Sequence, residues 1–290
     1  MEFPRVTLGR SGLQVSPVGL GSGYGIGARG VERAFERGIN FMYWGSARGS
    51  DFGRGLAAVA RKRREDLVVV VQSYSRMRLA MKPSVHSALR QLKIDYADIL
   101  LLGWWNKMPP NRILDGALTL REAGKVRHIM ISGHHRPAFQ SFIDEPLVDA
   151  VMVRYSAAHR GAEREVFPHA AARSDRPGVV AYTATRWGKL VDPQFTPPGE
   201  KTPTVADCYR FAFGHEDVDM CLCGPRNDAE LSAALSALSA ARTPMSDEER
   251  AWMARVGDAV HAATSNESVA RHMWQEVVRR VQDRNAAAPQ

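Results

Sequence analysis

The chain has 290 residues, of which 44% are apolar and 24% are charged. Together with a mean hydropathy of -0.29, this composition excludes a disordered, fibrous or membrane-embedded protein. The chain is longer than most single domains, but barrels of alternating strands and helices reach this size as one domain. Composition therefore predicts a soluble globular protein and leaves one or two domains open.

The net charge of +8 comes from 39 Lys and Arg residues against 31 Asp and Glu residues. A nucleic-acid-binding protein would concentrate this excess in one stripe or tail. Here the basic residues are scattered, except for the run 61–64, which directly precedes Glu65 and Asp66 and is typical of a solvated helix end. We therefore expect no nucleic-acid partner, and we expect the charge to attract small anionic ligands, phosphates included.

The three cysteines, Cys208, Cys221 and Cys223, are too few and too clustered for a disulfide framework. Cys221 and Cys223 alternate within an apolar run, which predicts one shared strand face, and no further ligand stands at metal-site spacing. Buried, reduced cysteines, no metal site and a cytoplasmic location are expected. The N-terminus has no apolar signal core and no apolar stretch is long enough to span a bilayer, so no membrane association is expected.

Short apolar runs recur about every 35 residues, with helical periodicity between them, including residues 31–37, 52–63, 85–92, 113–123 and 229–238. Eight such units predict an α/β fold, a closed (β/α)8 TIM barrel of parallel strands. The predicted strands are residues 18–21, 40–44, 67–72, 99–104, 126–132, 150–155, 179–183 and 218–223.

Additions are predicted at both ends of the barrel. Residues 5–15 alternate around a Gly-containing turn, which predicts a hairpin across one end. The barrel is then expected over residues 16–240, followed by C-terminal helices over 246–283, one from Ser246 to about Val260 and one over 268–282. No linker divides the chain, so a single domain over residues 1–290 is predicted. The Pro- and Gly-rich loop 191–204, after the seventh strand, is of a kind that covers a ligand.

Several short segments stand in an order and spacing known from one family. They are residues 8–21, 38–41, 64–66, 95–99, 124–129, 180–182 and 224–227. Over essentially the whole chain these segments resemble the aldo-keto reductase superfamily. The resemblance implies a barrel that transfers a hydride from NADPH to a carbonyl group, with a Tyr acid assisted by Lys, Asp and His.

All four catalytic positions implied by the resemblance hold other residues. Tyr43 stands at the Asp position, Arg48 at the Tyr position, Gln72 at the Lys position, and Gly103, before Trp104, at the His position. The family's phenol needs a neighbouring ammonium to lower its pKa. Arg48 cannot be an acid because guanidinium stays protonated, and the Gln72 amide has no charge. Carbonyl reduction by the inherited mechanism is not expected.

The cofactor positions implied by the resemblance are partly kept. Of the Ser, Asn and Gln that hold the nicotinamide amide, Ser132 remains, whereas Gly133 and Met152 replace the other two. On the adenosine side, Glu230 and Ala234 replace Gln and Asn, while an Arg beside a helix N-terminus suits a phosphate. NADP(H) binding is therefore left open. The implied cofactor-binding residues are Gly21, Ser22, Ser132, Tyr182, Thr183, Thr185, Arg186, Gly188, Gly224 and Arg226.

Aromatic and polar side chains follow the ends of predicted strands two to five, where a barrel carries its functional mouth. This composition is typical of a pocket that binds a small molecule, and the catalytic candidates are Tyr43, Arg48, Gln72 and His134. The candidates for lining the substrate pocket are Tyr74, Trp104, Trp105 and Asn106.

In one hypothesis, Tyr43 is a displaced acid whose pKa is lowered by Arg48 or His134, and Trp104 and Trp105 flank the substrate. Alternatively, Tyr43 and Trp44 are packing residues and Arg48 is a surface cation. Adjacent residues diverge in direction, so one of His134 and His135 is expected in the site and the other in solvent.

Three functions stay open. The first is an enzyme with changed chemistry, either redox with NADP(H) or a non-redox reaction on a bound small molecule. The second is a ligand-binding or regulatory pseudoenzyme, and the third is a conventional reductase with unrecognised substitutes.

Overall fold

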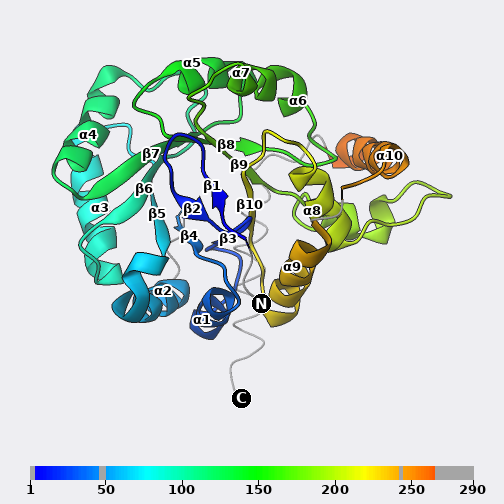
Figure 1. Ribbon diagram of the computed structural model, residues 1–290, viewed down its shortest axis with the longest axis horizontal. Coiled ribbons are helices and arrows are strands. Elements are labelled where there is room, and N and C mark those ends of the chain that lie inside the picture. Colours follow the sequence, from blue (N-terminus) through cyan, green and yellow to red (C-terminus); the bar gives the residue numbers. More distant parts are fainter. Residues whose placement is uncertain (1–3, 46–49, 242–243, 265–290) are drawn as a thin grey trace.

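The computed structural model describes residues 4–45, 50–241 and 244–264. Eight parallel strands close into a barrel in the order β10-β3-β4-β5-β6-β7-β8-β9 (Figure 1). The predicted TIM barrel is therefore confirmed, and every predicted strand overlaps an observed one. The strands are β3 (Val18–Gly21), β4 (Phe41–Trp44), β5 (Val68–Ser73), β6 (Ala97–Leu102), β7 (Val126–Ser132), β8 (Ala150–Arg154), β9 (Gly178–Tyr182) and β10 (Met220–Cys223).

The strands are largely apolar because both of their faces are covered. Strands β5 and β6 are buried at every residue, as expected for parallel strands with helices outside and side chains inside the barrel. Strand β6 ends two residues earlier than predicted. Trp104 has φ 57°, a left-handed conformation that is incompatible with continued extension.

A hairpin closes the N-terminal end of the barrel. Strands β1 (Val6–Thr7) and β2 (Gln14–Val15) pair in antiparallel fashion, which confirms the hairpin predicted over 5–15. Leu8 and Val15 are fully buried and belong to the same apolar cluster as the residues inside the barrel, such as Phe41 and Met130. In Figure 1 the hairpin crosses in front of the barrel. The opposite end is therefore the open mouth.

Helices surround the barrel (Figure 1). They are α1 (Ala28–Glu36), α2 (Ser50–Arg63), α3 (Arg78–Leu92), α4 (Asn111–Glu122), α5 (Phe139–Asp144), α6 (Ala162–Glu165), α7 (Phe167–Ala171), α8 (Val205–Phe213), α9 (Asp228–Ala241) and α10 (Asp247–Thr264). Short 3-10 turns are η1 (Arg64–Asp66), η2 (Arg136–Ala138), η3 (Lys189–Val191) and η4 (Pro193–Phe195). Among the residues that the structure describes, none of the helices is long and apolar enough to cross a membrane.

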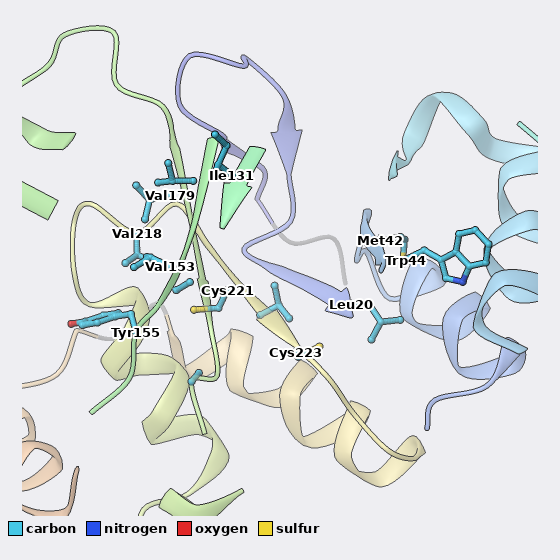
Figure 2. Close-up of a cluster of buried hydrophobic side chains, with 14 of the residues drawn as sticks. Leu20, Met42, Trp44, Ile131, Val153, Tyr155, Val179, Val218, Cys221 and Cys223 are labelled. Atoms are coloured by element: carbon cyan, nitrogen blue, oxygen red, sulfur yellow. The ribbon is translucent and has the colours of Figure 1, made fainter. Parts of the chain in front are cut away.

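A second, larger apolar cluster lies between the strands and the helices. Figure 2 shows part of it, with Cys221 and Cys223 on the same strand and Trp44 at the end of β4. Cys208, Cys221 and Cys223 are buried free thiols, as predicted. Burial raises the pKa of the Cys223 thiol to about 12, so this group stays protonated at neutral pH.

Two expectations about loops and ends are refined. Helix α10 confirms the first extra C-terminal helix, whereas the second, over 268–282, falls outside the described residues. The loop 191–204 contains η4, and Thr204 then caps α8 in a reciprocal capping box with Asp207. That this loop covers a ligand stays a prediction.

The basic run 61–64 differs in part from the expected solvated helix end. It does end α2, and Arg63 pairs with Asp66 at 2.5 Å. Arg64, however, turns inward and pairs at 2.8 Å with Asp98, whose side chain is 4% exposed. The Asp98 carboxylate also accepts the Val69 backbone N–H at 2.8 Å, so this pair joins two adjacent strands.

Candidate functional site

The carboxyl ends of the strands place one last layer of inward-facing side chains at the mouth. Because side chains alternate along a strand, Tyr43 and Tyr182 face the same side as the interior residues Phe41 and Val180. Both tyrosines are partly buried and contact the interior cluster. Trp44, by contrast, is 1% exposed in the outer cluster, so it is a packing residue.

Tyr43 and Gln72 are joined at the centre of this layer. The Tyr43 hydroxyl donates a hydrogen bond to the Gln72 Oε1 atom. Gln72 is buried, with 5% of its surface exposed. In this bond the phenol is the donor and the uncharged amide oxygen is the acceptor. Arg48, the other catalytic candidate on this side, lies outside the described residues.

Gly103 leaves the space that the Gln72 side chain occupies. A Cβ atom at Gly103 would lie 2.2 Å from Gln72 Nε2 and 2.7 Å from a ring carbon of Tyr74. Neither distance is compatible with van der Waals contact. The residues at positions 72 and 103 therefore depend on each other in this structure.

The expected aromatic residues separate into two sets. Tyr74 and Trp104 are exposed at the mouth and meet edge to face, with ring centroids 5.4 Å apart. Trp105 instead belongs to the outer cluster, 7% exposed, with the Arg76 guanidinium 3.9 Å above its ring. The expectation that Trp104 and Trp105 both flank a substrate is therefore corrected, because neighbouring side chains point in different directions.

His134 and His135 also diverge, as expected. His135 is exposed, whereas His134 is partly buried, with its ring centroid 5.8 Å from that of Trp104. Asn106 is exposed, and its side-chain oxygen is engaged by the backbone. Its Oδ1 accepts the backbone N–H groups of His134 and His135 at 2.8 and 3.1 Å, so it shapes this loop.

Arg154 is a site residue that the sequence analysis missed. It is two residues beyond Met152 on β8, so it faces the mouth, and its Nη2 atom lies 3.0 Å from His134 Nδ1. Burial and the Arg154 charge together lower the pKa of His134 to about 4. His134 is therefore uncharged at neutral pH and cannot lower the pKa of Tyr43 electrostatically. The two-residue alternation after Met152 was the signal that would have found Arg154.

The residues expected at the nicotinamide are present but engaged. Ser132 Oγ accepts the Trp104 backbone N–H at 3.3 Å. The Ser22 hydroxyl donates to the Gly45 carbonyl at 3.2 Å, and so ties β3 to the end of β4. Burial raises the pKa of Tyr182, against the opposing effect of Arg154. Tyr182 therefore remains a neutral aromatic ring that is available for stacking.

The expected pyrophosphate loop is a tight turn held in an unusual conformation. Thr183, Arg186 and Trp187 have φ between 53° and 64°, a region that non-glycine residues seldom adopt. The turn is closed internally, since Thr185 Oγ1 accepts the Gly188 N–H at 3.3 Å. Thr183 Oγ1 is buried and makes no hydrogen bond in the described part of the chain. The Arg186 side chain points away from this loop and donates to the Thr264 carbonyl oxygen at 3.2 Å.

The expected adenosine-phosphate position is closed by a carboxylate. Arg226 Nε donates to Glu230 Oε1 at 2.6 Å, and the Arg226 backbone N–H donates to Glu230 Oε2 at 2.8 Å. The Tyr24 ring covers Gly224, because a Cβ atom there would lie 2.3 Å from the ring. From the sequence, Glu230 was expected only to replace a Gln on the adenosine side. The fold shows that its carboxylate binds Arg226.

Comparison with known proteins agrees with this fold. The family model described as "Aldo/keto reductase family" matches residues 28–204, and the chain therefore belongs to the aldo/keto reductase family. The holo form of an aldo-keto reductase from Bacillus halodurans has a TM-score of 0.72 at 21% identity, covering 88% of this chain and 96% of that one.

Two structures from Klebsiella pneumoniae are similar to the same extent. An aldo-keto reductase in complex with NADPH has a TM-score of 0.71 at 21% identity, covering 89% of this chain and 96% of that one. An aldo/keto reductase in complex with NADP and acetate has a TM-score of 0.71 at 18% identity, covering 88% and 96%. At these identities the likeness shows the barrel fold.

Replacing Gly103 by Ala tests the dependence between positions 72 and 103. The added methyl group displaces the buried Gln72 amide, so we expect Gly103→Ala to lower the free energy of unfolding by about 1–3 kcal/mol. In a Gln72→Ala background the same replacement should cost about 1 kcal/mol less, a coupling measured by urea unfolding of the four proteins. An equal cost in both backgrounds would show that Gln72 does not fill this space.

The pH dependence of stability tests the burial of His134 and His159. Burial first, and then the nearby Arg186 and Arg154 charges, lower the pKa of His159 to about 3 from 6.5. Below about pH 6.5 the unfolded chain binds protons that the folded chain does not, so the free energy of unfolding should fall with falling pH. We expect a loss of about 1–2 kcal/mol for each imidazole between pH 6.5 and 5.

The measurement is urea unfolding across this pH range in a chloride medium. His159→Asn should reduce the pH slope, and His135→Asn, at an exposed neighbour of His134, should leave it unchanged. If His159→Asn and the unaltered protein had equal slopes, this account of His159 would be wrong.

Proposed function

We propose that this chain is a small-molecule-binding member of the aldo/keto reductase family whose mouth does not reduce carbonyls through the family's assisted-phenol mechanism. One observation carries the proposal: the Tyr43 hydroxyl donates to the neutral Gln72 amide. A proton donor to an alkoxide needs a pKa matched to its task, and a neighbouring cation supplies this match. The Gln72 carbonyl instead holds the proton on the phenol.

The surroundings support the same conclusion. Gln72 and Tyr74 fill the space beside Gly103, so position 103 itself offers no side-chain donor to a carbonyl oxygen. The mouth still presents the exposed rings of Tyr74 and Trp104 beside the polar groups of Ser132 and His134. Aromatic walls with a few convergent polar groups are typical of small-molecule sites.

An NADP(H)-linked oxidoreductase with a non-standard site is the second candidate. It is favoured by the strained turn at Thr183, whose buried hydroxyl lacks a hydrogen bond within the described residues. This turn would hold the pyrophosphate, and Tyr182 would stack on the nicotinamide ring. The nicotinamide would supply hydride chemistry when bound. The adenosine-phosphate end fits poorly, because Glu230 already neutralises Arg226. NADP(H) binding is therefore part of this proposal and not of the first.

A turnover assay separates the two candidates. With NADPH at saturating concentration and a panel of aldehydes and ketones, the first proposal expects no oxidation of NADPH above the uncatalysed rate. NADPH fluorescence titration, run in parallel, reports binding independently of turnover. Substantial turnover that is abolished by Tyr43→Phe would overturn the first proposal, and turnover unchanged by Tyr43→Phe would remove Tyr43 from the mechanism.

Replacing Glu230 by Gln tests the closed adenosine-phosphate position. The replacement keeps the side-chain shape but removes the charge that neutralises Arg226. We expect NADPH affinity to rise about five- to tenfold, since charge-assisted bonds from Arg to phosphate become available. NADH lacks the additional phosphate that NADPH carries on its adenosine ribose, so its affinity should not change. Equal changes for NADPH and NADH, or none for either, would contradict this role of Glu230.

A further inference from the structure

A second hollow lies beside the mouth, next to the ends of β7, β8 and β9. Its volume is about 230 Å³. Guanidinium and imidazole groups dominate its wall, and none of the described residues that line it is Asp or Glu. These groups are Arg136, Arg154 and Arg186, with His134, His159 and His261. We call this hollow the cationic pocket.

Arg154 carries positive charge into the cationic pocket without a carboxylate partner among the described residues. Its Nη2 atom lies beside His134 Nδ1, and its Nε atom is buried without a hydrogen bond. Its guanidinium lies 5.5 Å from the centre of the Trp187 ring. A buried donor on a charged group is costly to leave unsatisfied, which points to an acceptor from outside the described chain.

The other two arginines are held in place by the protein. Arg136 Nε donates to Glu165 Oε1 at 2.8 Å, so one carboxylate balances it. Arg186 is 2% exposed and is fixed by the backbone carbonyl of Thr264 at the end of α10. Side chains fixed in this way lose little conformational entropy when a ligand binds.

His134 and His159 add hydrogen-bonding groups rather than charge, because burial lowers the pKa of both imidazoles. His159 and His261 meet edge to face with ring centroids 5.1 Å apart, and His159 Nε2 is buried without a hydrogen bond among the described residues. Within the described residues, no three His, Cys, Asp or Glu side chains converge as metal ligands. The wall therefore suits an anion bound by arginines, with imidazole groups as further partners.

We propose that the cationic pocket binds the anionic oxygen-bearing group, phosphate or carboxylate, of a small molecule. The planar fork of guanidinium donors matches both groups. This inference rests on the proposed small-molecule function and deepens it, because it assigns the charge class of the ligand. The cationic pocket does not include Arg226, which belongs to a different loop and is neutralised by Glu230.

Arg154 also links the cationic pocket to the mouth. It stands at the end of β8, next to Tyr182 on β9 in the barrel register, and its charge acts on the Tyr182 hydroxyl. His134 likewise lines the cationic pocket and touches Trp104. A ligand whose anionic group sits in the cationic pocket would therefore extend its remaining part toward Trp104 and Tyr182.

The test is isothermal titration of the full chain with inorganic phosphate and, separately, with acetate, each at ionic strength matched with chloride. Saturable binding of either anion is expected. The anion that binds more tightly shows whether the anionic group of the ligand is a phosphate or a carboxylate. Arg154→Gln should weaken that binding at least about tenfold, the loss typical of one charge-assisted contact. Arg226→Gln, the matched control, removes one positive charge elsewhere and should change it less than about twofold.

Thermal unfolding shows whether each variant is folded, so that a loss of binding is not mistaken for a loss of structure. The tighter anion should raise the midpoint temperature of the unaltered protein and of Arg226→Gln, but not that of Arg154→Gln. Arg154→Gln itself should unfold no earlier than the unaltered protein, because it removes a partly buried charge that has no carboxylate partner among the described residues.

Absence of saturable binding, or binding lost in Arg226→Gln and kept in Arg154→Gln, would overturn the inference. The NADPH titration is a separate measurement, so failure of anion binding leaves the result for NADP(H) and carbonyl turnover intact.

Discussion

The hydrogen bond from the Tyr43 hydroxyl to the Gln72 amide organises the mouth of this barrel. Both side chains belong to the last inward-facing layer, and the phenol hydroxyl donates to the amide oxygen. The Gln72 amide then needs the space beside Gly103. Around this pair the mouth offers rings, a hydroxyl and an amide, but no described ammonium group that would prepare the phenol for proton transfer.

Positive charge at the mouth is distributed unevenly. At the loop after β10 it is cancelled, because Arg226 is bound by Glu230. At the ends of β7 and β8 it is retained, because Arg154 faces His134 and has no carboxylate partner in the described residues. We therefore expect an anion attracted by the net charge of +8 to bind more favourably beside the mouth than at the loop after β10.

Much of the fold could be predicted because it depends on local patterns. Alternation and run length located all eight strands, and the Gly-containing turn located the hairpin. The strand ends were less certain, since the left-handed Trp104 that ends β6 has no simple sequence signal. Alternation also separated His134 from His135.

Site residues that depend on long-range contacts could not be predicted. Tyr24 covers Gly224 from a loop some two hundred residues earlier. Trp105 is indistinguishable from Trp104 by residue type, and only the fold shows that it lies in the outer cluster. The cationic pocket combines three strand ends with α10, and no sequence spacing reveals that combination.

The central claim is that the Tyr43 hydroxyl serves as a hydrogen-bond donor to the Gln72 amide and not as an activated acid. Ultraviolet difference absorbance of the unaltered protein against Tyr43→Phe, followed between about pH 6 and pH 9, reports ionisation of this one phenol directly. The account predicts no phenolate signal in that range. A phenolate that appears near neutral pH and is missing in Tyr43→Phe would contradict it, because an activated phenol would then be present at the mouth.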